Sequence, residues 1–142
     1  MTLYLESSAV LAWLLDEPIA SAVVEAIRSA KQLVASVLTV LECARAMLRA
    51  VTTGRIPEAE AAKRRGRLEM AARRWSVAAV LTEHVERARR PFPVEPIRTL
   101  DALHLAAALH FQHELLGLTV LSLDARVRQN AEALGFPVLP NG

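Results

Sequence analysis

Four acidic residues, Glu6, Glu42, Asp101 and Asp124, occupy the positions in the sequence that best suit metal chemistry. Glu6 and Asp124 each follow a short apolar stretch, whereas Glu42 and Asp101 lie near the start of stretches with helical periodicity. Carboxylates brought to one place repel one another, and a divalent cation relieves that repulsion. Their oxygens suit Mg²⁺ or Mn²⁺, and two such ions about 4 Å apart can clamp a phosphodiester. The pattern therefore favours a metal site that acts on phosphate.

Each acid also has a local explanation, and for any single acid that explanation is the simpler one. Glu42 completes a capping box with Thr39, and Asp124 is a good N-cap for the helix that follows it. Asp101 lies where the dipole of a helix favours negative charge, and Glu6 could merely precede two capping serines. A shared site explains all four acids together.

The acids depend for their position on short apolar strands that alternate with helices. Strands are predicted at residues 2–5, 32–36, 76–81, 119–123 and 136–139; helices are predicted at 9–15, 18–29, 39–53, 57–74, 99–115 and 125–134, with a short helix capped by Thr82. The alternation predicts an α/β fold with a mainly parallel sheet of four to five strands, covered by helices on both faces. Ligands bind such sheets beyond the carboxyl ends of the strands, where we expect all four acids.

Length and composition are those of one globular domain, expected to span residues 1–142. The chain is 53% hydrophobic and 4% aromatic. Its single cysteine, Cys43, excludes an internal disulfide, favours the reducing cytoplasm and is expected to be a small buried hydrophobe. No Gly-rich phosphate loop is present, and we expect neither a signal peptide nor a membrane span. The mean hydropathy of +0.26 predicts a surface that a partner or a second copy covers.

Basic residues gather in one part of the chain. The segment Gly54–Arg74 contains seven Lys or Arg residues and three Glu residues. Such a region is compatible with nucleic-acid binding, although a solvated helix face is the simpler interpretation of charge alone. The candidate RNA contacts are Lys63, Arg64 and Arg65 in this segment, together with Arg45 and Arg49, which could instead pair with surface acids.

Four stretches, in their order and spacing, carry a resemblance to a known family. They are YLESSAVLAWLL from Tyr4, SVLTVLECARAM from Ser36, RTLDALHLAAAL from Arg98 and VLSLDARVRQNAEALGFPVL from Val120. Over nearly its whole length the chain resembles the PIN-domain family, and within it the VapC-type toxins of VapBC toxin–antitoxin pairs. The resemblance implies a three-layer α/β/α fold and an endoribonuclease that uses one or two Mg²⁺ or Mn²⁺ ions.

The resemblance also implies site residues and partners. It maps the acidic ligands of the family onto Glu6, Glu42, Asp101 and Asp124, and its small hydroxyl residues onto Ser8 and Ser122. The family usually has Asp where this chain has Glu6, and the longer side chain bears on activity more than on fold. The implied partners are an RNA substrate, an antitoxin protein and a second copy of the chain. The alternative is a degenerate PIN domain that binds RNA or antitoxin without cleavage.

His104 shares a helix face with Asp101, because the two are three residues apart. This spacing could form a mixed metal pair. The simpler expectation is that His104 packs against neighbouring helices or bonds to a backbone carbonyl group.

Overall fold

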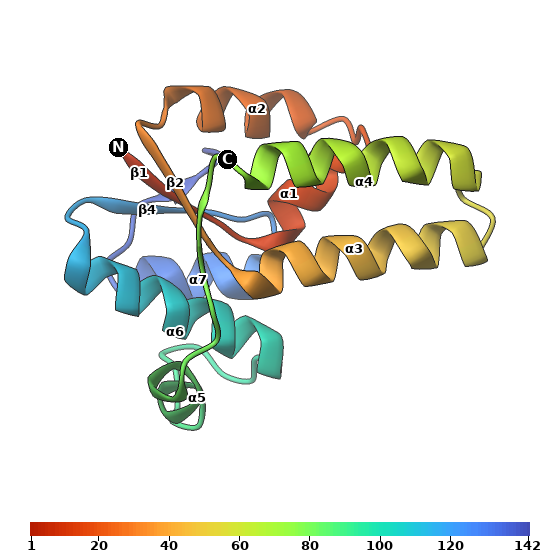
Figure 1. The fold of residues 1–142 in the computed structure, drawn as a ribbon. Coiled ribbons are helices and arrows are strands. Elements are labelled where there is room, and N and C mark those ends of the chain that lie inside the picture. The colour runs from red at the N-terminus through yellow and green to blue at the C-terminus, as the bar shows by residue number, and fades with distance from the viewer.

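The computed structural model describes residues 1–142 and contains five strands and seven helices (Figure 1). The strands are β1 Thr2–Leu5, β2 Gln32–Ser36, β3 Ser76–Ala78, β4 Leu118–Leu121 and β5 Val138–Leu139. The helices are α1 Ser7–Leu14, α2 Ala20–Ser29, α3 Val37–Thr52, α4 Glu58–Ala72, α5 Thr82–Ala88, α6 Thr99–Glu114 and α7 Ala125–Ala133. The predicted alternation of strands and helices is confirmed, and the differences lie at the ends of elements.

The five strands form one sheet in the order β3-β2-β1-β4-β5, and every neighbouring pair is parallel. The predicted parallel sheet is therefore confirmed, with β1 at its centre. The two edge strands are shorter than predicted, with three residues in β3 and two in β5. At the β5 edge, Phe136 is buried in the core at 3% exposure, so it packs among helices and does not extend the strand.

Side chains of the central strand alternate between two cores, one on each face of the sheet. Leu3 and Leu5 pack into the core shared with α1 to α4, whereas Tyr4 packs into the core shared with α6 and α7. Figure 1 shows α2 and α4 on one side of the sheet and α6 on the other. Each fully buried leucine contributes about 1.5–3 kcal/mol. The three-layer fold is confirmed, and both faces of the sheet are covered.

Helix α3 begins earlier than predicted, which changes the environment of Glu42. It starts at Val37, and its N-cap is Ser36, whose Oγ accepts a hydrogen bond from the Leu38 N–H at 3.2 Å. Thr39 is buried inside the helix and donates from Oγ1 to the Leu5 carbonyl oxygen at 2.8 Å. The predicted capping box of Thr39 and Glu42 is therefore wrong, and Glu42 lies in the second turn.

Two further helix starts differ from the prediction for related reasons. Helix α1 starts at Ser7 because the Glu6 side chain itself is the cap, accepting the Ser8 N–H at 3.0 Å. The expectation that the two serines cap this helix is wrong. Helix α5 starts at Thr82, so the predicted cap is instead its first residue, and Leu81 is the N-cap.

The helices of this fold are short compared with membrane-spanning helices. The longest two, α3 and α6, have 16 residues each, and none in the chain qualifies as a membrane span.

Candidate active site

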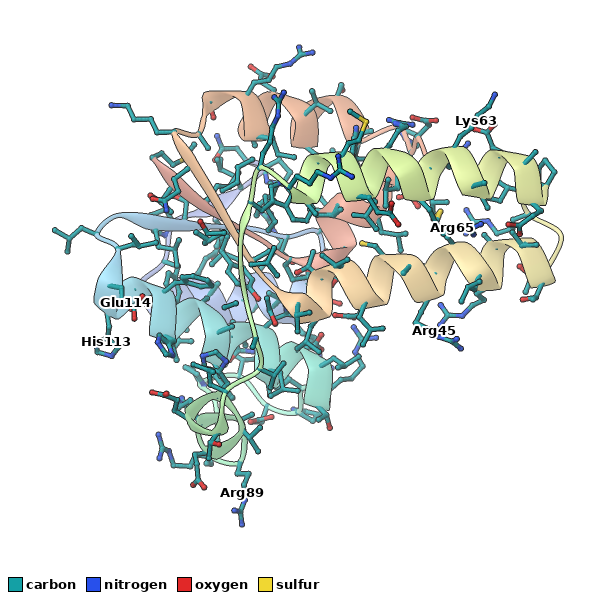
Figure 2. All side chains as sticks on the ribbon, in the orientation of Figure 1. Arg45, Lys63, Arg65, Arg89, His113 and Glu114 are labelled. Atoms are coloured by element: carbon teal, nitrogen blue, oxygen red, sulfur yellow. The ribbon has the colours of Figure 1, made fainter.

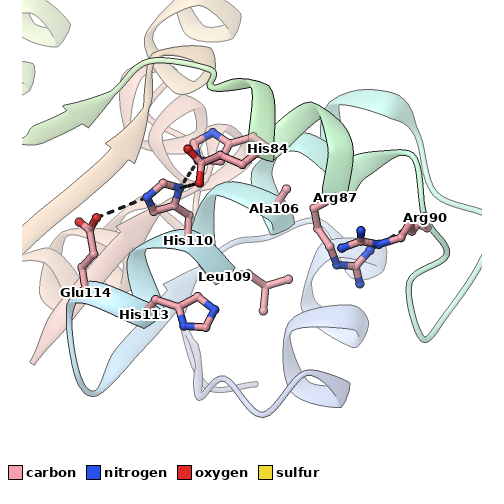
Figure 3. Close-up of a pocket in the computed structure, with 9 residues that line it drawn as sticks. His84, Arg87, Arg90, Ala106, Leu109, His110, His113 and Glu114 are labelled. Atoms are coloured by element: carbon pink, nitrogen blue, oxygen red, sulfur yellow. Dashed lines mark hydrogen bonds and ion pairs between the residues drawn. The ribbon is translucent and has the colours of Figure 1, made fainter.

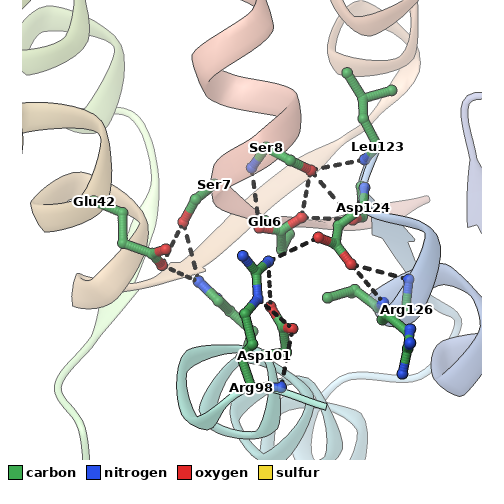
Figure 4. A network of polar contacts seen from close by, with 12 residues as sticks. Glu6, Ser7, Ser8, Glu42, Arg98, Asp101, Leu123, Asp124 and Arg126 are labelled. Atoms are coloured by element: carbon green, nitrogen blue, oxygen red, sulfur yellow. Dashed lines mark hydrogen bonds and ion pairs between the residues drawn. The ribbon is translucent and has the colours of Figure 1, made fainter. Parts of the chain in front are cut away.

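All four predicted acids line one hollow at the carboxyl ends of the central strands. Glu6 directly follows β1, and the loop after the neighbouring strand β4 carries Asp124. Glu42 reaches into the hollow from α3, and Asp101 does so from the first turn of α6. The hollow has a volume of about 450 Å³ and all four acids contribute to its lining (Figure 4). The strand order thus collects acids from both ends of the chain.

Glu6 is held by hydroxyl groups, although it is almost fully buried at 4% exposure. Besides the Ser8 N–H, its carboxylate accepts from Ser8 Oγ at 2.5 Å and from Ser122 Oγ at 2.5 Å. Ser8 Oγ in turn accepts the Leu123 N–H at 2.8 Å, which ties the end of β4 to the start of α1. Short hydrogen bonds to a carboxylate are strong. The two hydroxyl residues implied by the resemblance therefore lie against this acid and fix its orientation.

Asp101 and Asp124 share one guanidinium group. Asp124 Oδ1 accepts the N–H groups of Arg126 at 3.0 Å and Val127 at 3.1 Å, so its predicted role as the cap of α7 is confirmed. Its other oxygen, Oδ2, accepts from Arg98 Nη2 at 2.9 Å. Asp101 is 4% exposed and accepts from Arg98 Nε at 3.1 Å and Nη2 at 3.3 Å. Arg98 therefore bridges two acids from different elements.

Glu42 is bound by a buried relay of polar side chains. Its Oε1 accepts from Ser7 Oγ at 2.7 Å and from His104 Nε2 at 2.5 Å. His104 is 1% exposed, and its Nδ1 lies 2.8 Å from the Tyr4 hydroxyl. Because ionised Glu42 can only accept, His104 Nε2 donates to it. Of the two alternatives expected for His104, packing in the interior is confirmed, and its hydrogen-bond partners are side chains, not a backbone carbonyl group.

These contacts favour the charged form of Glu42. Partial burial raises its pKa, but the hydrogen bond and charge of His104, the Ser7 hydroxyl and the charge of Arg98 together outweigh burial. The net result is a pKa below the ordinary value for a glutamate. Burial, aided by nearby negative charge, raises the pKa of Tyr4 well above its ordinary value, so the phenol keeps its proton.

Cys43 is adjacent to Glu42 in the sequence but takes no part in the acid chemistry. It is fully buried, and burial, together with the charges of Glu42 and Glu6, raises the pKa of the thiol to about 12. A protonated thiol is a poor nucleophile. The expectation of a small buried hydrophobe is confirmed.

Most of the chain matches one protein family. Residues 3–133, which include all four acids, match the PIN domain. This chain belongs to the PIN domain family. The resemblance inferred from the four sequence stretches is thus confirmed. A comparison with curated protein sequences gives no match.

Several toxin proteins of known structure share this PIN fold. A toxin–antitoxin complex from Klebsiella pneumoniae matches with a TM-score of 0.63 and 16% identity, covering 99% of this chain and 97% of that chain. VapC20 of Mycobacterium tuberculosis, described as a sarcin–ricin loop cleaving toxin, has a TM-score of 0.66 and 13% identity, with 94% and 95% covered. VapBC2 of Rickettsia felis, bound to a promoter DNA fragment, has a TM-score of 0.65 and 7% identity, with 98% of each chain covered. At these identities the likeness establishes a common fold.

The five candidate RNA contacts of this PIN domain fall into two groups. Arg45 and Arg49 extend from α3 and line the same hollow as the acids. Lys63, Arg64 and Arg65 lie on α4 and do not line it; Figure 2 shows Lys63 and Arg65 along that helix. Arg64 and Arg65 already pair with glutamates of their own helix at N–O distances of 3.1 and 2.5 Å. Among the five, Arg45 and Arg49 are the ones that share a hollow with the acids.

The donor chemistry of the hollow fits a hard divalent cation, although the side chains do not surround one point. The four acids offer carboxylate oxygens only, which is the ligand type that Mg²⁺ and Mn²⁺ prefer. No three Asp, Glu, His or Cys side chains of the chain are arranged to hold a metal ion. The hydrogen bonds explain this arrangement, because Asp101 and Asp124 hold Arg98 while Glu42 holds the proton of His104.

The sequence predicts neither Ser7 nor Arg98 as a site residue, yet both line the hollow. Arg98 had a usable signal, since a cation three residues before Asp101 at a helix start can form an ion pair with it. Ser7 had none, because its partner Glu42 lies 35 residues away in the sequence.

A second polar hollow, of about 460 Å³, lies between α5 and α6 (Figure 3). His84 Nε2 lies 2.8 Å from His110 Nδ1, and His84 Nδ1 accepts the Leu81 N–H at 3.2 Å. His84 therefore donates from Nε2, and both rings are satisfied in the neutral form. The polar lining of this histidine hollow comes from Glu83, His84, Arg87, Arg90, His110, His113 and Glu114.

Proposed function

We propose that this PIN domain is a metal-dependent endoribonuclease that acts as the toxin of a VapBC-type toxin–antitoxin pair. The observation that carries the proposal is the gathering of four carboxylates in one hollow, where one arginine is the only cationic side chain paired with Asp101 and Asp124. Such an excess of negative charge is unfavourable unless a cation binds. The match to a toxin described as cleaving the sarcin–ricin loop supports RNA as the substrate class.

The reaction would be hydrolysis of a phosphodiester bond, and the residues of the chain would bind and orient its components. The four acids would hold one or two Mg²⁺ or Mn²⁺ ions. The chemistry supplied by bound ions is activation of water and neutralisation of charge on the phosphate. Ser8 and Ser122 would keep one carboxylate oriented and His104 another, while Arg45 and Arg49 would bind phosphates of the RNA backbone.

Asparagine substitutions of two acids test the nuclease proposal. Asp101→Asn and Asp124→Asn keep the shape of each side chain, and asparagine is also a good N-cap. Each variant should lose cleavage of a labelled RNA by about 10²-fold or more while keeping the circular dichroism spectrum of the unmodified chain. The control is His113→Gln, at an exposed residue of the histidine hollow. RNA degradation that persists in both asparagine variants and in EDTA would refute the proposal.

Binding of Mn²⁺ should also stabilise the fold. An ion that binds only the native state raises the melting temperature by mass action, and free Mn²⁺ at about ten times its Kd should raise Tm by about 3–5 °C. Differential scanning calorimetry measures the shift. No shift, together with no heat of binding, would contradict a shared metal site.

A protein partner is the second part of the proposal. Val37, Leu41 and Leu48 on α3 are exposed at 44%, 55% and 45%, and apolar residues exposed on one helix favour a covering partner. The structural match to a toxin–antitoxin complex supports an antitoxin in this role. A toxin homodimer in the cytoplasm is the remaining part of the proposal. Co-expression with the neighbouring reading frame should give one complex in size-exclusion chromatography. Separate elution at micromolar concentration would count against it.

A degenerate PIN domain that binds RNA or antitoxin without cleavage is the second candidate function. Glu6 in place of the usual Asp favours it. RNA binding without metal-dependent cleavage by the purified chain would select this function over the first.

A further inference from the structure

The Arg98 side chain lies between two acids at the mouth of the acidic hollow (Figure 4). Its Nη2 donates to Asp124 Oδ2 at 2.9 Å and to Asp101 Oδ1 at 3.3 Å, and its Nε donates to Asp101 Oδ2 at 3.1 Å. The side chain is nevertheless 76% exposed. A positive charge that touches two buried or half-buried carboxylates, and that is itself open to solvent, can leave without rearranging the core.

Arg98 also lines two neighbouring hollows. It lines the acidic hollow of about 450 Å³ and a neighbouring hollow of about 410 Å³ whose lining includes Asp101, Asp124 and Arg126. Both carboxylates thus line both hollows, and the guanidinium group contacts both of them. Its pKa is raised, chiefly by the hydrogen bond to Asp101, so the group carries its charge throughout.

We propose that Arg98 is an internal counter-ion that a divalent cation must displace from Asp101 and Asp124 in order to bind. This inference rests on the metal site of the proposed function. The backbone of Arg98 is fixed, because it is the N-cap residue of α6 and its N–H donates to Asp101 at 3.3 Å. Displacement therefore moves only the long side chain, which stays at the rim of the hollow. There its planar guanidinium group is available to a phosphate of the RNA.

One substitution of Arg98 distinguishes competition with the ion from positioning of the two carboxylates, because the two roles change the affinity for Mn²⁺ in opposite directions. If Arg98 competes with the ion, Arg98→Met, which keeps much of the stem and removes the charge, should increase the affinity for Mn²⁺. The increase should be about three- to tenfold, since exposed ion pairs are weak. If Arg98 instead holds the two carboxylates in place for the ion, the same variant should bind Mn²⁺ less tightly.

Isothermal titration calorimetry with Mn²⁺ alone measures these affinities. The matched control is Arg126→Met, because Arg126 is exposed near Asp124 but its side chain bonds to the Pro96 carbonyl oxygen and to no acid. This control removes the same charge and should change the affinity by less than about twofold. An Arg98→Met affinity that is unchanged or lower overturns the inference, as does an equal rise in both variants. Binding that appears only in Arg98→Met would support it.

A second measurement follows the guanidinium group directly. The ¹⁵N–¹H signal of Arg98 Nε, identified by its loss in Arg98→Met, should shift when Mg²⁺ is added to the unmodified chain. A signal that keeps its position at saturating Mg²⁺ overturns displacement. Both readouts are independent of RNA. A chain that cleaves RNA but shows no competition retains the proposed function and loses this inference, whereas competition without cleavage does the opposite.

Discussion

Helix α6 carries two polar clusters, one toward each end, and they satisfy their buried polar groups in opposite ways. Near its N-terminus, Asp101 lines the acidic hollow and the buried His104 bonds to Glu42 of that hollow; near its C-terminus, His110 and Glu114 line the histidine hollow. The two hollows have nearly equal volumes, of about 450 and 460 Å³. In the histidine hollow the paired rings are satisfied while neutral. In the acidic hollow, carboxylates outnumber the cations that contact them.

The comparison shows that the size of a hollow does not identify a site. The hydrogen-bonded pair of neutral imidazoles needs no bound ligand, and it contributes to the packing of α5 on α6. An excess of one charge on rigid elements is unfavourable for the folded protein alone, and ligands of opposite charge relieve it. The acidic hollow is therefore the one in which chemistry is expected.

The largest expected effect is on the rate of RNA cleavage, which should fall when the acidic hollow is altered and not when the histidine hollow is altered. Glu42→Gln removes a charge from the acidic hollow and should lower the rate of RNA cleavage by about 10²-fold. His110→Gln alters the other hollow and should leave that rate within about twofold. Single-turnover cleavage of a fluorogenic RNA measures both variants. If both variants lost the same fraction of the cleavage rate, the acidic hollow would not be distinguished from the histidine hollow as the site of the reaction.

A smaller effect concerns the length of Glu6. Its Oε1 meets Ser8 Oγ and Ser122 Oγ at 2.5 Å each, so a side chain shorter by one methylene would leave both hydroxyls. Glu6→Asp should therefore lower cleavage by about tenfold, because small misplacements in a site are costly. Ser122→Ala is the matched variant and should shift the rate in the same direction. A rate that rises in Glu6→Asp would show that the longer side chain is held out of place.

The smallest expected effect is a dependence of stability on pH that comes from the histidine hollow. Burial, followed by the adjacent His110, lowers the pKa of His84 in the folded chain. The unfolded chain then binds more protons than the folded one as pH falls below about 6.5, so stability is lost on acidification and is fully present above that pH.

Calorimetry at about pH 7.5 and about pH 5.5 measures this loss. The drop in Tm between the two should be smaller in His84→Gln than in the unmodified chain by about 2 °C. His113→Gln, at an exposed ring, should leave the drop unchanged. An unaltered drop in His84→Gln would mean that other groups account for the pH dependence.

The sequence was sufficient for the sheet and for the location of the four acids. Apolar strands as short as Thr2–Leu5 leave few alternatives to a buried parallel sheet, and in such a sheet residues that follow neighbouring strands meet at one end. The acids follow from this topology without knowledge of any side-chain contact.

The sequence was insufficient where a side chain has partners far away in the chain. Thr39 has the spacing of a cap, yet its hydroxyl bonds to the Leu5 carbonyl, 34 residues away. His104 joins Tyr4 and Glu42, which lie 100 and 62 residues away. Local propensity carries no information about such pairs, because they form only once helices and sheet have packed.

The central position of β1 has a consequence for when the protein can act during its own synthesis. This first strand pairs on one side with β4, and Glu6 receives its hydrogen bond from Ser122, 116 residues later. Contacts so distant in the sequence form late in folding. A nascent chain that has emerged from the ribosome only as far as α6 lacks both Ser122 and Asp124, and its sheet has no β4. Under the proposed function, the ribosome is thus not exposed to an active nuclease while it is still synthesising this chain.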